Sequence, residues 1–201
     1  IKHGSTGDIR LMTVTTIPTA GIADNAVTAA KAGFDPGKIG QVVTTSFTGT
    51  ESATTVATSD SFTNSSVAAS ITPTATSSKI FVSCQINTGA TNHVDGSHVG
   101  RFTQAISGGS TTAVNIGATD GNRIETSSGR GTESQGSNTL LNTHFSFVLS
   151  PSTTSAVTVT YQFTCRGTGS STVYINRTGD DGDNVEQQRT ASHITLMEVL
   201  A

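Results

Sequence analysis

Charged residues are scarce in this sequence, and none of them form a basic run. The 201 residues include 11 Lys and Arg against 14 Asp and Glu, so the formal net charge is -3. Proteins that bind nucleic acids present clusters of Lys and Arg, often interleaved with aromatic residues. We therefore expect no nucleic-acid partner.

Long apolar runs are also missing, and cysteine is rare. No stretch approaches the roughly 20 apolar residues of a membrane-spanning helix, so we expect no membrane insertion. Cys84 and Cys165 are too few to form a disulfide scaffold. Both lie in phase with the apolar residues around them, which favours buried free thiols. A single bridge between two sheets is the alternative.

The clearest pattern in the chain is a two-residue alternation over residues 143–177. Because side chains of a strand point to opposite faces in turn, this pattern predicts three half-buried antiparallel strands. We interpret them as consecutive strands of one meander, which requires a second layer to cover it. The residues expected on its buried face are Phe145, Phe147, Leu149, Val157, Val159, Tyr161, Phe163, Cys165, Val173 and Ile175.

The rest of the chain from Gly40 onward supplies further short strand signals. They recur about every 8–12 residues, which is typical of an all-β sandwich or jelly roll with nine or ten strands. No helical period interrupts them. The candidate strands outside the meander are 41–48, 61–69, 69–73, 79–87, 100–107, 112–118 and 192–199.

Residues 1–39 differ in character from the rest. Within them, GIADNAVTAAKAG, residues 21–33, predicts a short helix that Asp24 can cap and Gly33 can end. Its apolar residues are mostly Ala, and a helix of about three turns is marginal alone in water. We therefore expect residues 1–39 to be an attachment or stalk segment whose helix packs against copies of itself or against a shaft, and residues 40–201 to be a β-sandwich head.

Two polar segments, 88–100 and 119–138, are predicted to be long loops, which are usually functional. Their neutral donors and acceptors suit saccharide hydroxyls or a polar protein face. Arg123 and Arg130 add bidentate contacts to acidic sugars or phosphates. The candidate residues for contact with such a partner are His93, Asp95, His98, Arg123, Glu125, Arg130, Glu133 and Gln135.

The sequence contains no motif that indicates catalysis, a metal or a cofactor. His93, Asp95 and His98 do not have the spacing of a tight ligand set, and the acidic cluster Asp180, Asp181 and Asp183 lacks the pattern of a calcium loop. There is no nucleophile elbow. We expect a protein that is not an enzyme and has no cofactor.

Two stretches resemble proteins of tailed phages. GIADNAVTAAK, residues 21–31, resembles segments that precede the distal domains of tail fibres, and residues 129–199 are similar to a domain of virion proteins from marine phages and cyanophages. The resemblance implies a homotrimer in the virion, with a head like the jelly roll of complement and tumour-necrosis-factor trimers.

On this resemblance, we expect residues 1–39 to bind other virion proteins and the head to bind a host surface glycan or protein. Two alternatives are a capsid decoration or tail component that packs on virion proteins, and a glycan-degrading tailspike. A tailspike needs a pair of acidic side chains in a groove, about 5–10 Å apart.

Overall fold

A computed structural model describes residues 38–54, 61–91, 96–131, 136–167 and 171–200. They belong to a compact unit that spans Gly37–Ala201. The helix predicted at 21–33 lies outside the described residues, as do residues 1–37 of the predicted stalk segment 1–39, and both stay predictions.

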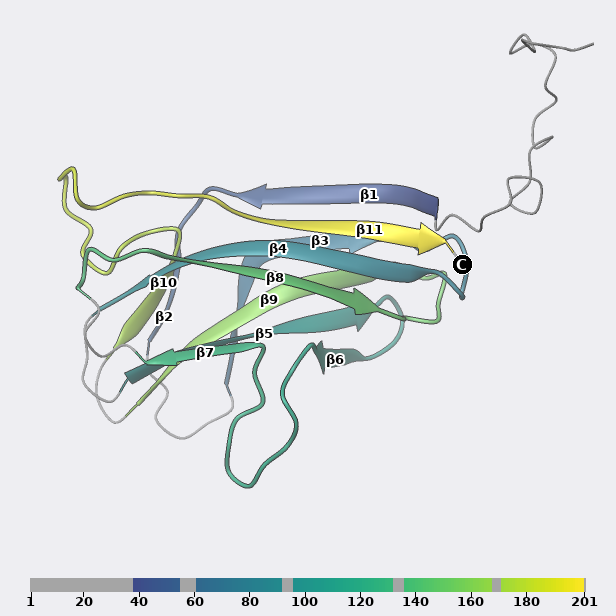
Figure 1. The fold of residues 1–201 in the computed structure, drawn as a ribbon, viewed down its shortest axis with the longest axis horizontal. Coiled ribbons are helices and arrows are strands. Elements are labelled where there is room, and N and C mark those ends of the chain that lie inside the picture. The colour runs from purple at the N-terminus through teal and green to yellow at the C-terminus, as the bar shows by residue number, and fades with distance from the viewer. Residues whose placement is uncertain (1–37, 55–60, 92–95, 132–135, 168–170, 201) are drawn as a thin grey trace, which may run out of the picture. The chain divides into compact units, whose positions relative to one another are not determined.

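The described residues form strands and no helix, and the strands make two antiparallel sheets (Figure 1). The larger sheet, sheet A, has the order β1–β11–β4–β10–β2, and β8 also pairs with β4. Its strands are β1 (Lys38–Phe47), β2 (Glu51–Thr54), β4 (Lys79–Ala90), β8 (Leu141–Leu149), β10 (Thr172–Ile175) and β11 (Ser192–Leu200). No membrane-spanning helix exists in the described ranges.

The smaller sheet, sheet B, has the order β3–β9–β5–β6, and β7 also pairs with β5. Its strands are β3 (Thr63–Ile71), β5 (Gly96–Ile106), β6 (Thr111–Val114), β7 (Ser128–Gly131) and β9 (Val157–Gly167). The two sheets pack face to face, which confirms the predicted all-β sandwich.

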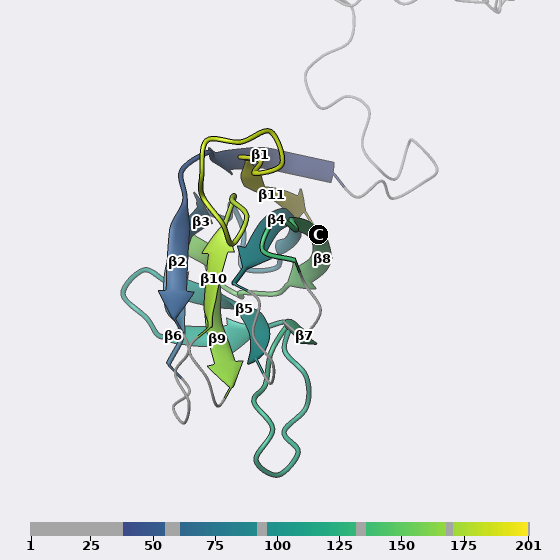
Figure 2. The same ribbon diagram turned by 90° about the vertical axis from the view of Figure 1, so that its left-hand side faces the viewer.

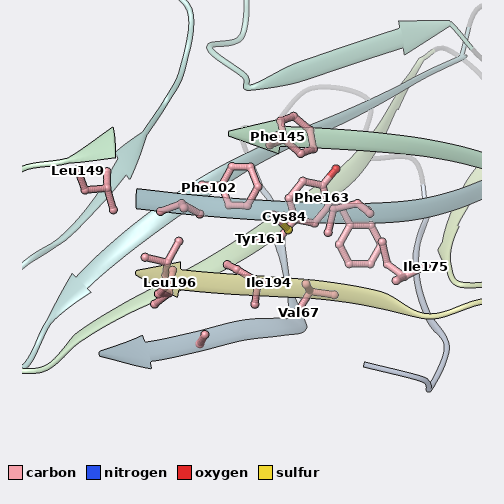
Figure 3. Close-up of a cluster of buried hydrophobic side chains, with 14 of the residues drawn as sticks. Val67, Cys84, Phe102, Phe145, Leu149, Tyr161, Phe163, Ile175, Ile194 and Leu196 are labelled. Atoms are coloured by element: carbon pink, nitrogen blue, oxygen red, sulfur yellow. The ribbon is translucent and has the colours of Figure 1, made fainter. Parts of the chain in front are cut away.

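Apolar side chains from both sheets fill the space between them (Figure 3). Phe102 of sheet B lies at their centre, with ring centroids of Phe145, Phe147 and Tyr161 at 5.1, 5.1 and 5.3 Å. Every second residue of β9 from Val157 to Cys165 is at most 1% exposed. The alternation in the sequence therefore identified the buried faces of β8, β9 and β10.

The prediction that these three strands form one meander was wrong. β8 pairs with β4 in sheet A, whereas β9 pairs with β3 and β5 in sheet B, and β10 returns to sheet A. The buried faces of β8 and β9 thus meet across the core, with the Phe145 and Tyr161 centroids 6.1 Å apart. Alternation shows that a strand has one buried face, but it does not show which sheet the strand joins.

Both cysteines are buried and free. Cys84 lies in β4 and Cys165 in β9, and each has no exposed surface. Burial raises the pKa of the Cys84 thiol to about 12, so this group stays protonated. The prediction of buried free thiols is confirmed.

A buried carboxylate ties β11 to β1 and to the connection between β3 and β4, at the end where β1 begins and β11 finishes. Glu198 is fully buried. Its carboxylate accepts hydrogen bonds from Gln41 Nε2 at 2.8 Å and from the Thr74 backbone N–H and hydroxyl at 2.6 and 2.8 Å. Burial alone would raise the pKa of Glu198, but these hydrogen bonds outweigh it and lower the pKa to about 2.

Asn176 holds the segment between β10 and β11 against the opposite end of sheet A. Its amide donates to the carbonyl oxygens of Phe47 and Gly49 at 2.8 and 3.0 Å, and its side-chain oxygen accepts from the Ser192 hydroxyl at 2.6 Å. The residue adopts a φ of 62° and is fully buried. Asn tolerates this left-handed conformation better than most residues.

Candidate functional site

The segment between β6 and β7 extends away from the two sheets (Figures 1 and 2). Between this segment and the outer face of sheet B lies an open hollow of about 310 Å³, here called the Arg101 hollow. The residues that line it are Arg101, Thr119, Arg123, Ile124 and Glu125.

Arg101 reaches the hollow because it lies on the outward face of β5. Its neighbour Phe102 points into the core and is fully buried, so Arg101 must point to the other side of the sheet. The guanidinium lies 4.0 Å from the ring centroid of Phe62, and its Nε donates to Gln162 Oε1 at 2.8 Å. Gln162 in turn donates to Asn64 at 2.6 Å. The cation is thus held in place before any ligand arrives.

The segment that forms the other wall is held by its own hydrogen bonds. Gly117 N–H donates to the Thr126 carbonyl at 3.1 Å, and Ser127 N–H donates to the Gly100 carbonyl of β5 at 2.8 Å. These two bonds close the base of the segment on the sheet. Between them, the chain is free to present side chains without joining a strand.

Polar side chains within the segment also pair with one another. Arg123 forms an ion pair with Asp120, and the Thr119 hydroxyl donates to Glu125. The side chains of Arg123 and Asp120 are 78% and 67% exposed, so their pairing adds little stability. Their charges remain accessible to a ligand.

The hollow therefore combines guanidinium donors, a carboxylate acceptor and a hydroxyl around one apolar side chain, Ile124. A polyhydroxylated ligand needs such a mixture, because each sugar hydroxyl both donates and accepts hydrogen bonds. A metal is not indicated, since the described residues contain no group of three His, Cys, Asp or Glu side chains suited to hold one.

Two of the eight predicted contact residues, Arg123 and Glu125, line the hollow. Two others, His98 and Arg130, are neighbours in the paired strands β5 and β7. The remaining four, His93, Asp95, Glu133 and Gln135, lie outside the described residues, and their role stays a prediction.

Both predicted loops are shorter than expected. β4 continues to Ala90 and β5 starts at Gly96, so His98 is a strand residue that is only 7% exposed. β7 likewise occupies Ser128–Gly131 within the predicted loop 119–138. The assignment of His98 to an exposed loop was therefore wrong. Its backbone pairs with both β7 and β9, which places it inside sheet B.

His98 is kept neutral by its surroundings. Burial lowers its pKa, the charge of Arg130 lowers it further, and the result is a pKa of about 4. Burial also lowers the pKa of the Arg130 guanidinium. At neutral pH the pair thus carries a single positive charge, which belongs to Arg130.

Sequence reasoning missed Arg101, Thr119 and Ile124. Arg101 lies within a strand signal, where an outward charged residue normally indicates a solvated face. Only the spatial approach of residues 119–125 to β5 makes it part of a site. Thr119 belongs to the predicted loop 119–138, and nothing in its sequence context distinguishes it from the many other Thr residues.

No protein-family model matches the chain, and no curated protein sequence matches it either. Among solved structures, it is similar to one of infectious bursal disease virus, Gx strain, with 12% identity, 80% of this chain covered and a TM-score of 0.42. A mutant VP2 protein of the same virus, in derived T=1 particles, has 13% identity, 81% coverage and a TM-score of 0.40. A VP2 subviral particle of that virus has 12% identity, 80% coverage and a TM-score of 0.36. This chain spans 37% to 42% of the length of these matched chains.

Proposed function

We propose that this chain is a structural protein of a phage virion, a homotrimeric fibre whose β-sandwich head attaches to a glycan on the host cell surface. The observation that carries the attachment role is the Arg101 hollow, an open polar depression whose cationic wall is fixed by Phe62 and Gln162. A preorganised polar site loses little side-chain entropy on binding.

The composition of the hollow favours an acidic or neutral saccharide. Arg123, whose side chain is 78% exposed, can donate hydrogen bonds to a carboxylate or to vicinal hydroxyls, Arg101 contributes its positive charge, and Glu125 can accept from a hydroxyl. Single contacts of this kind are weak. Three heads on one fibre strengthen attachment, because the later binding events become intramolecular.

The fibre role assigns residues 1–39 to attachment on other virion proteins and residues 40–201 to contact with the host. In this proposal the head binds no nucleic acid and needs no cofactor. It also performs no hydrolysis in this proposal; a glycosidase needs two placed carboxyl groups, and among the described residues that line the hollow Glu125 supplies one. A capsid decoration or tail component is the alternative, in which the head packs on virion proteins.

Binding of the labelled 201-residue chain to bacterial cells, and to immobilised polysaccharides extracted from them, tests this function. We expect saturable binding that Arg123→Gln weakens at least tenfold. Arg189→Gln is the matched control, because Arg189 is also an exposed arginine paired with an aspartate, Asp181, but lies in a different segment. Equal loss in both variants, or no binding to any cell or polysaccharide, would contradict the proposal. Shortened polysaccharide products after incubation would indicate a depolymerase instead.

A further inference from the structure

The outer face of sheet A carries a row of four apolar side chains. Val42 of β1 pairs with Met197 of β11, Met197 pairs with Phe81 of β4, and Phe81 pairs with Val148 of β8. Directly paired residues of neighbouring strands point to the same side of a sheet, so these four side chains form one continuous line. We call it the apolar row.

The apolar row is open to solvent at both ends. Val42 and Val148 are 54% and 55% exposed, and Ile39, which continues the apolar surface at the edge of β1, is 54% exposed. Phe81 and Met197 between them are half-buried. Single exposed apolar residues are ordinary, but a contiguous group on one flat face marks an interaction surface.

The next row on the same face consists of hydroxyl groups, contributed by Thr44, Thr195, Ser83 and Ser146. The four strands contain one acidic residue, Glu198, and it points into the sandwich. A basic partner would therefore find no complementary carboxylate on this face, although Lys79 of β4 lies exposed beside the row. A second surface of the same kind would match it, because apolar groups meet apolar groups and each hydroxyl can both donate and accept.

The position of the apolar row also favours a second copy. β1 begins at Lys38, which pairs with Leu200, and Ile39 and Val42 follow it at once. The 37 residues that precede β1 therefore join the head at the edge of this face. In the fibre proposed above, those residues hold copies of the chain together. The apolar row starts four residues after the first residue of β1, so it lies close to the point where neighbouring heads are joined.

We infer that the apolar row is a contact surface between copies of this chain, with Val42 and Val148 at its two edges. The inference rests on the proposed fibre assembly and adds the face through which the heads touch. It is independent of the Arg101 hollow, which lies on the outer face of the other sheet.

The oligomeric mass of the 201-residue chain, measured by light scattering over a dilution series, tests the inference. The test variant is the double substitution Val42→Lys and Val148→Lys, which places like charges at an exposed contact. We expect the concentration for half-dissociation to rise at least tenfold. Val185→Lys is the matched control, because Val185 is 96% exposed and lies between β10 and β11, away from the four strands. It should dissociate like the unmodified chain.

Oxidation of Met197 by hydrogen peroxide gives a second measurement that needs no substitution. If copies cover the apolar row, Met197 should oxidise more slowly in the assembled protein than after dilution. A double variant with unchanged mass, or equal Met197 oxidation in both states, would overturn the inference. A monomeric unmodified chain would overturn it too. None of these three results would remove the proposed glycan binding, which a head can show without its neighbours.

Discussion

Gly100 in β5 leaves open the space that the hydroxyl group of Tyr161 in β9 occupies. A Cβ atom on Gly100 would lie 2.5 Å from Cζ of Tyr161 and would overlap the hydroxyl oxygen. Tyr161 is 1% exposed and contacts Phe102, so its ring has no free space to move into.

Gly100→Ala should therefore destabilise the head by about 2–3 kcal/mol, the usual cost of overpacking a core. Urea unfolding followed by far-ultraviolet circular dichroism, at fixed protein concentration, measures the change. Gly129→Ala in β7 is the control, because the nearest atom to its added Cβ would be 3.7 Å away. Similar losses in both variants would show that the close contact with Tyr161 is not the cause.

Phe102→Ala should destabilise the head by about 3–5 kcal/mol, because Phe102 is fully buried among three other aromatic rings. Phe147→Ala should cost less, since Phe147 is only partly buried on β8 at the edge of the core. Thermal or urea unfolding of the two variants side by side checks this order. A larger loss of unfolding free energy for Phe147→Ala than for Phe102→Ala would contradict the conclusion that Phe102 is the more deeply buried side chain.

His98 should make the head less stable in mild acid. Its pKa is about 4 in the folded protein, below its ordinary value of 6.5. As the pH falls below 6.5, the unfolded chain therefore binds a proton that the folded chain does not, and stability decreases until the pH reaches about 4. The full loss is on the order of 3 kcal/mol.

Unfolding free energies at pH 7, 5.5 and 4.5 should show this decrease. The variant His98→Gln cannot titrate, so it should lose much less stability over the same range. If both proteins lost the same amount, the decrease would come from other groups.

Glu198 should also make the head less stable as the pH falls, but over a lower pH range than His98. Its folded pKa of about 2 lies below the ordinary value of 4.5, so its contribution is present above pH 4.5 and is lost as the pH falls towards 2. Glu198→Gln should destabilise the head by about 1–3 kcal/mol at pH 7, because hydrogen bonds to a charged acceptor are replaced by weaker ones. Glu186→Gln, at an exposed position, should have little effect. Equal stability of the Glu198 and Glu186 variants at pH 7 would contradict this role.

The sequence predicted strands well wherever apolar and polar residues alternate, as from Val157 to Cys165. It missed β2 and β7, because Glu51–Thr54 and Ser128–Gly131 have no such alternation. These strands form because β10 and β5 offer them backbone hydrogen bonds. The sequence also did not predict which sheet each strand joins, because the strands that pair with β8 and β9 are distant along the chain.

The sequence predicted only part of the candidate site, because the site combines residues that are distant along the chain. Arg123 and Glu125 belong to a polar segment whose length indicated a function, and both line the Arg101 hollow. Arg101 is a strand residue that becomes part of the site only through the approach of residues 119–125. His98 was wrongly assigned to a loop, because polar residues lie around it although it belongs to β5, which pairs with both β7 and β9.

The pairing of β1 with β11 also has a consequence for biosynthesis. Among the described strands, β1 leaves the ribosome first and β11 last, yet β11 lies between β1 and β4. Until β11 emerges, β1 has no neighbour in sheet A and the edge of β4 stays unpaired, which is a condition that favours aggregation. A chain that stops after residue 191 should therefore be found mainly in the insoluble fraction, whereas the 201-residue chain should stay in the soluble fraction. The head can close only when its final strand has been made.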